Sequence, residues 1–159
     1  MNAVDLLISH HRELEGRFKK LMDAKPPEQG EFNDVADSLA AHITVEEELF
    51  YPAVKAERTE DILLESLEEH LSLKRVLADL LALTPADEKF EPKLHVLVEQ
   101  AEHHHKEEEE HLFPKVKKMF SSDRLDKLGS EMKQRMDHLS EVAVRKRVPQ
   151  QTADSTTLA

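Results

Sequence analysis

Apolar residues recur at helical spacing in five blocks of this chain, and this pattern leaves few folds open. The blocks cover roughly residues 3–24, 31–52, 59–81, 94–114 and 123–147, with short polar stretches such as KPPEQG and TPADEKFEP between them. With only 3 Gly and no Trp, and with abundant Ala, Leu, Glu and Lys, the chain favours helix and offers little material for strands. The sequence therefore predicts an all-α fold.

The first four blocks are long, carry one apolar stripe each and are joined by short connections. Such helices bury their stripes most simply as an antiparallel up-down-up-down four-helix bundle. Pro52 and Pro114 should kink or end the second and fourth helices, because proline removes a backbone donor. We expect the fifth block to add a C-terminal helix on the outside of a single domain, residues 1–147. Residues 148–159, VPQQTADSTTLA, are expected to form a disordered tail.

Charge and composition exclude several classes of partner and chemistry. The chain has 33 acidic and 22 basic side chains and a net charge of −11, so nucleic acid and anionic membranes are not expected to bind it. The absence of cysteine excludes disulfides, thiol nucleophiles and iron–sulfur clusters. No signal peptide or membrane span is expected, which predicts a cytoplasmic protein. The sequence does not identify a protein partner.

Two segments of the second and fourth blocks repeat each other. HITVEEELFYP and HHKEEEEHLFP align on Pro52 and Pro114, an offset of 114 − 52 = 62 residues. The alignment pairs His42 with His104, Glu46 with Glu108, Glu47 with Glu109, and Tyr51 with Phe113. Residues four apart on a helix differ by about 40° and one turn, so each His and Glu can converge on one cavity.

The triplet His103, His104 and His105 is ambiguous by spacing alone, because each histidine has a glutamate four residues later. The repeat selects His104, and the apolar stripe through Leu97 and Ala101 agrees with it. His103 and His105 are therefore expected to flank the stripe and face water.

His11 and His70 occupy core positions in the first and third blocks. A lone core histidine is more often structural than a ligand. Four buried imidazoles and two buried carboxylates, however, are costly to leave unpaired, and a bound cation removes that cost. Six mixed nitrogen and oxygen donors exceed the need of one zinc ion and suit two octahedral ions, for which iron is the natural candidate.

The pattern H…HxxxE…H…HxxxE, followed by EEELFYP and EEEEHLFP, resembles the hemerythrin-like HHE cation-binding proteins of bacteria over about residues 3 to 120. The resemblance implies a four-helix bundle around a non-haem centre of two iron ions with an oxo or hydroxo bridge. The metal ligands it implies are His11, His42, Glu46, His70, His104 and Glu108.

One position departs from the oxygen carriers of this group, which have a second histidine one turn after the third-helix ligand. Here that position is Lys74. The departure shifts the expectation from reversible oxygen carriage towards peroxide or nitric oxide chemistry, or towards sensing. Glu15 stays open as a replacement oxygen donor, and Tyr51 is not counted, since it lies about 180° from His42 on an ideal helix.

The favoured hypothesis is a di-iron protein that binds or reacts with dioxygen, hydrogen peroxide or nitric oxide, with catalase-like or oxidase activity left open. One alternative is iron storage or donation, including repair of damaged metal clusters. Another is a structural module whose histidines take metal incidentally.

Overall fold

The computed structural model describes residues 1–158, and its regular structure within that range is helical with no strand, so the predicted all-α fold is confirmed. Short helices α3 (Tyr51–Ala53) and α6 (Phe113–Met119) continue two of the long ones. The long helices are α1 (Ala3–Asp23), α2 (Gln29–Val45), α4 (Glu60–Leu81), α5 (Phe90–Glu107) and α7 (Ser122–Leu139).

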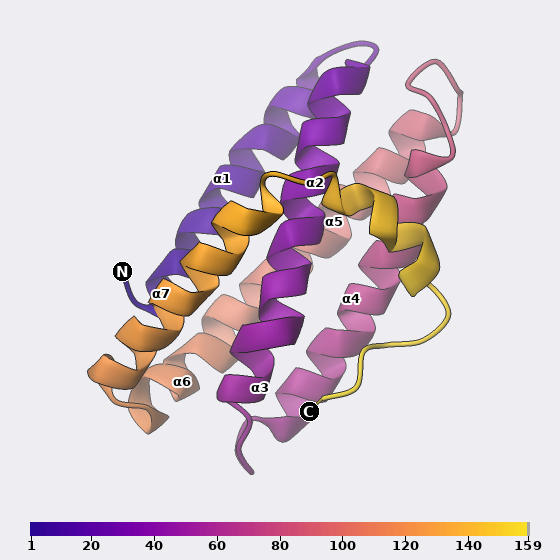
Figure 1. Cartoon of the computed structure of the whole chain (residues 1–159). Coiled ribbons are helices and arrows are strands. Elements are labelled where there is room, and N and C mark those ends of the chain that lie inside the picture. The colour runs from indigo at the N-terminus through magenta and orange to yellow at the C-terminus, as the bar shows by residue number, and fades with distance from the viewer. Residues whose placement is uncertain (159) are drawn as a thin grey trace.

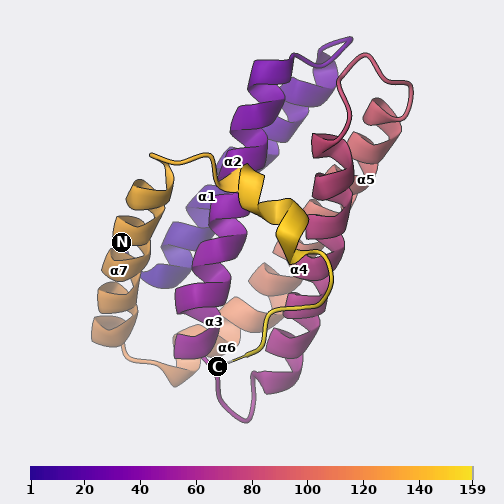
Figure 2. The same cartoon turned by 45° about the vertical axis from the view of Figure 1, so that its right-hand side comes forward.

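Helices α1, α2, α4 and α5 surround a common core. Each of them packs against two of the others, in the order α1, α2, α4, α5 and back to α1. The loops α1–α2 and α4–α5 lie at one end of the molecule, whereas α3 and α6 lie at the other (Figures 1 and 2). Helix α7 lies outside this group, against α1 and α2.

Aromatic side chains close the core at both ends. Phe18, Phe32 and Phe90 are fully buried near the two loops, and the rings of Phe32 and Phe90 meet edge to face at 5.0 Å. Phe50 and Phe113 are buried at the opposite end. Each such side chain contributes roughly 1.5–3 kcal/mol through burial. The polar residues discussed below are therefore enclosed between two apolar layers.

Both predicted proline interruptions take the form of a π-helical turn. The turns cover Glu46–Phe50, between α2 and α3, and Glu108–Leu112, between α5 and α6. The backbone N–H of Tyr51 bonds to the carbonyl of Glu46, and that of Phe113 bonds to Glu108, five residues back in each case. The proline that follows has no N–H and could not form an α-helical hydrogen bond in any case. The wider π turn therefore sacrifices no additional hydrogen bond at that position. The chain continues as helix, rotated relative to an ideal one.

The C-terminal segment differs from the expectation. Helix α7 ends at Leu139, and Val144–Gln151 form a 3-10 helix that crosses α2 and α4. Val148 is buried there, and Arg145 forms an ion pair with Asp37 at 2.8 Å.

Residues 152–158 of the expected disordered tail also take a defined path, running along α4 in Figure 2, and residue 159 lies outside the described residues. Arg75 Nε donates to the carbonyl of Thr152 at 2.9 Å, and Thr156 Oγ1 donates to Glu47 Oε1 at 2.5 Å. Side chains distant in sequence thus hold a segment whose own composition gives no helical or strand signal. Within residues 1–158, no helix is both long and apolar enough to cross a bilayer.

Candidate metal centre

All six residues singled out by the sequence lie in one buried cluster. His11, His42, His70 and His104 project from α1, α2, α4 and α5, and Glu46 and Glu108 begin the two π turns. None of the six is more than 1% exposed. Their ligating atoms form two overlapping groups in which all atoms lie within 4.8 Å of one another, and Glu46 belongs to both. The two groups are His11, His42, Glu46 and Glu108, and Glu46, His70 and His104.

Each of the two carboxylates lies between imidazoles from different helices. Glu46 Oε1 is 3.4 Å from His42 Nε2 and 3.1 Å from His70 Nε2. Glu108 Oε1 is 3.2 Å from His11 Nε2 and 3.6 Å from His104 Nε2. This is the placement expected of carboxylates that join two neighbouring cation positions.

Several of these atoms lack any hydrogen-bond partner within the described residues. They are His11 Nε2, both ring nitrogens of His42, Glu46 Oε2 and Glu108 Oε1, all buried. Leaving a buried polar atom without a partner costs about 1–3 kcal/mol, more for a charged group. A cation at the centre would satisfy His11 Nε2, His42 Nε2 and the two carboxylate oxygens together, so the residues fit a metal.

Outer carboxylates orient three of the four histidines. Glu109 Oε2 lies 2.7 Å from His11 Nδ1, Glu47 Oε2 lies 2.8 Å from His70 Nδ1, and Glu69 Oε1 lies 2.9 Å from His104 Nδ1. A carboxylate at Nδ1 keeps the proton there and leaves the Nε2 lone pair free for a metal. Glu47 and Glu109 occupy equivalent positions of the repeat, directly after Glu46 and Glu108. The second glutamate of each HxxxEE segment was therefore the sequence feature that could have indicated these outer carboxylates.

Tyr51 points into the centre, although ideal helical geometry places it on the far side from His42. Its hydroxyl donates to Glu108 Oε2 at 2.8 Å and lies 3.3 Å from the Nε2 atoms of His70 and His104. The π turn explains the difference, because its extra residue rotates Tyr51 by about 100° towards the core. Burial, followed by the charges of Glu108 and Glu46, raises the pKa of Tyr51 well above its usual value.

His105 was predicted to face water, and this is wrong. It is 1% exposed, and its ring stacks on that of His11 with centroids 3.9 Å apart. His11, His42 and His105 form a third group of ligating atoms within 4.8 Å. Helix α5 packs against both α1 and α4, so two adjacent faces of it are buried. His103 is exposed, as predicted.

The metal-free histidines differ in basicity according to their partners. Burial lowers the pKa of His42 and of His105 well below the usual value, and the neighbouring His11 lowers both further. Burial also disfavours charge on His104, but Glu108, Glu46 and Glu69 outweigh it and raise the pKa of His104 well above the usual value. The centre therefore combines neutral imidazoles, ready to ligate, with others that must release a proton when metal binds.

Lys74 supports the centre from outside. It is 4% exposed, and its Nζ lies 2.9 Å from Glu47 Oε1.

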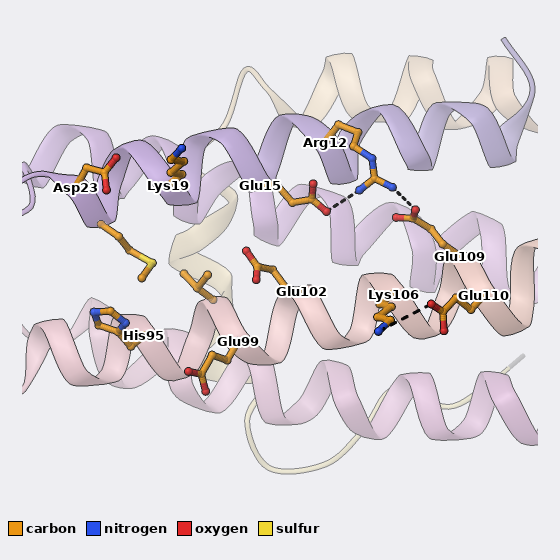
Figure 3. A pocket seen from close by; sticks show the side chains of 12 residues that line it. Arg12, Glu15, Lys19, Asp23, His95, Glu99, Glu102, Lys106, Glu109 and Glu110 are labelled. Carbon is orange, nitrogen blue, oxygen red and sulfur yellow. Dashed lines mark hydrogen bonds and ion pairs between the residues drawn. The ribbon is translucent and has the colours of Figure 1, made fainter.

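On the opposite side of the centre, Arg12 pairs with Glu109 and with Glu15, as Figure 3 shows. Glu15 lies at the surface in that pair and not in the cluster, so its suggested role as a replacement donor is not supported.

Comparison with known proteins agrees with this geometry. The family model of the hemerythrin HHE cation binding domain matches residues 2–116 and also 66–157, and the second match begins shortly before His70. A DNA nickase of Nostoc sp. is 27% identical over 84% of this chain, which spans only 38% of that protein's length. The protein Rv2633c of Mycobacterium tuberculosis is 28% identical over 87% of this chain and 88% of its own.

Among solved structures, a hemerythrin HHE cation binding domain-containing protein from Mycobacterium kansasii, a homologue of Rv2633c, shares the fold. Its TM-score is 0.80 at 23% identity, with 93% of this chain and 99% of that chain covered. The family match spans the helices that carry every residue of the cluster. The chain therefore belongs to the hemerythrin HHE cation-binding family.

Proposed function

We propose that this protein is an antiparallel bundle holding a non-haem di-iron centre that reacts with small oxidants, namely dioxygen, hydrogen peroxide or nitric oxide. The observation that carries the proposal is the pair of overlapping donor groups that share Glu46. Two overlapping groups provide for two ions with a common carboxylate, and mixed nitrogen and oxygen donors suit iron.

The donors divide into two sides. His11, His42 and His105 would hold one ion, and His70 and His104 would hold the other. Glu46 and Glu108 would join them, since each contacts imidazoles of both sides. The Tyr51 hydroxyl, 3.3 Å from both His70 and His104, is placed to act as an additional oxygen donor on the second side.

A pair of iron ions would supply electron exchange with a small oxidant. The protein's own contribution is enclosure and proton placement. Both aromatic layers exclude bulk water, and in the metal-free centre the Tyr51 hydroxyl donates to Glu108 Oε2 at 2.8 Å, a proton that Tyr51 would release on ligating iron. Lys74 stands where oxygen carriers of this family have another histidine, and its ammonium pairs with Glu47 at 2.9 Å. This favours reaction with the oxidant over its reversible carriage.

Metal analysis tests the proposal most directly. Protein given excess ferrous iron and exposed to air should retain about two irons per chain and absorb in the near ultraviolet, as bridged ferric pairs do. Peroxide turnover should then proceed without loss of iron to a chelator. Retention of a single ion, or preference for one zinc, would contradict the di-iron assignment.

A further inference from the structure

A pocket of about 320 Å³ between α1, α2 and α7 borders the metal centre at one candidate ligand. Its lining includes His42, which is 1% exposed and has no hydrogen-bond partner at either ring nitrogen. Two other pockets lead only to outer carboxylates. One, shown in Figure 3, includes Glu109, and the other includes Glu69. The pocket beside α7 instead includes a candidate ligand itself.

His42 differs from the other three histidines of the repeat because no carboxylate holds its Nδ1. The internal repeat shows which residue takes the place of that carboxylate. His11 corresponds to His70, 59 residues later, and at the same offset His10 corresponds to Glu69, the carboxylate that holds His104. His10 is therefore the counterpart, beside His42, of the carboxylate beside His104. His10 lines the pocket, its ring lies edge-on to that of His42 with centroids 6.0 Å apart, and its buried Nδ1 also lacks a partner.

The outer part of the pocket is negatively charged. Its lining includes the carboxylates of Glu13, Asp34 and Asp37 and a single cationic residue, Arg17. Glu13 pairs with Arg17 at 3.2 Å and Asp37 pairs with Arg145 at 2.8 Å, whereas Asp34 is exposed and forms no ion pair within residues 1–158. Asp34 therefore leaves the mouth with a net negative charge, which raises the local concentration of cations. The Glu109 side offers no equivalent path, since Arg12 already occupies that carboxylate.

We propose that this pocket is the uptake route for a divalent cation, ferrous iron, and that His10 is a transient ligand that passes the ion to His42. Imidazole nitrogens suit ferrous iron, and these two have no competing hydrogen bond to give up. Because neither ring nitrogen of His42 has a hydrogen-bond partner, no hydrogen bond opposes a turn of this ring between pocket and centre. The inference rests on the proposed metal centre.

Release of ferrous iron from the reduced, loaded full-length protein to a chromogenic chelator, and its anaerobic uptake afterwards, tests the route. A residue on the path changes both rates by one factor and leaves the affinity unchanged, whereas a ligand of the final site changes the affinity. His10→Ala should slow both rates roughly tenfold, which corresponds to a barrier about 1.4 kcal/mol higher when the transient ligand is lost. Asp34→Asn should slow uptake at low salt and lose its effect at high salt.

His95→Ala is the matched control, because this exposed histidine lines the pocket of Figure 3 and should change neither rate. Unchanged rates in His10→Ala would overturn the route. Faster rates would also overturn the ligand role of His10, because they would show that its side chain only obstructs the pocket. A lower affinity or iron count would place His10 among the resident ligands and also overturn the proposal. Failure of the unmodified protein to bind iron would instead refute the metal centre itself.

Discussion

Glu47 links three parts of the molecule, so replacing it by glutamine tests the outer support of the centre. Its carboxylate contacts His70 Nδ1 at 2.8 Å, Lys74 Nζ at 2.9 Å and Thr156 Oγ1 at 2.5 Å. Burial would raise its pKa, but the hydrogen bond and charge of His70, then Thr156 and Lys74, lower the pKa of Glu47 from 4.5 to about 2. One pKa unit is worth about 1.4 kcal/mol, so these contacts contribute about 3 kcal/mol to the folded state.

Glu47→Gln should therefore lower the free energy of unfolding of the metal-free protein by about 3 kcal/mol at pH 7. Because the folded-state pKa lies below the unfolded value, this contribution is fully present above about pH 4.5 and is lost as the pH falls towards 2. In the loaded protein, the weaker orientation of His70 should reduce affinity for one metal ion by about 10- to 100-fold.

Urea unfolding at pH 7 and a competitive metal titration measure the two effects. Glu48→Gln is the matched control, since the neighbouring carboxylate pairs with Arg135 at the surface, 2.8 Å away, and such pairs contribute up to about 1 kcal/mol. Lys74→Ala should lower stability but keep the iron count, because Glu47 would still hold His70. Equal losses from Glu47→Gln and Glu48→Gln would refute the assigned role of the outer carboxylate.

Further changes separate the two sides of the centre and test the packing of α7. His105→Ala should lower the affinity for one iron about 10-fold or more, whereas His103→Ala should leave metal titrations unchanged. Tyr51→Phe should remove any visible charge-transfer band and alter one component of the iron-57 Mössbauer spectrum; loss of both components equally would contradict a one-sided role. Gly129→Ala should lower stability by about 1–3 kcal/mol in urea unfolding, because its Cβ would lie 2.8 Å from the Asn2 backbone carbon. Gly16→Ala, with nothing within 4 Å, should instead stabilise by about 0.5–1 kcal/mol.

The sequence predicted the helices and the positions of the six clustered residues because both depend on local periodicity. An apolar stripe fixes which face of a helix is buried, and the 62-residue repeat fixes which His and Glu share that face. These two rules place His42 and Glu46 on one face without knowledge of the neighbouring helices.

What the sequence did not predict depends on departures from the ideal helix or on neighbours distant in sequence. Tyr51 reaches the centre only because a bond to the residue five back replaces the usual one. His105 is buried because α1 covers a second face of α5. The path of residues 152–158 depends on donors such as Arg75 on another helix, which no local pattern reveals.

The repeat also shows how the two halves of the centre come to differ. The 62-residue offset pairs Tyr51 with Phe113 and Ile43 with His105. On the His11 side, α5 and α6 provide His105, stacked at 3.9 Å, and Phe113, whose ring centroid lies 5.8 Å from that of His11.

On the His70 side, the same positions of α2 and α3 provide Ile43, which is buried but offers no donor, and Tyr51, whose hydroxyl lies 3.3 Å from His70 Nε2. Each half thus gains one further donor from a different repeat position, a nitrogen in one and a phenol oxygen in the other. The two repeated segments supply matching histidines and glutamates, and these two differences between them would make the two proposed metal positions chemically unequal. An oxygen donor favours the ferric state more than an imidazole does, so an iron ion bound on the Tyr51 side should be the harder one to reduce.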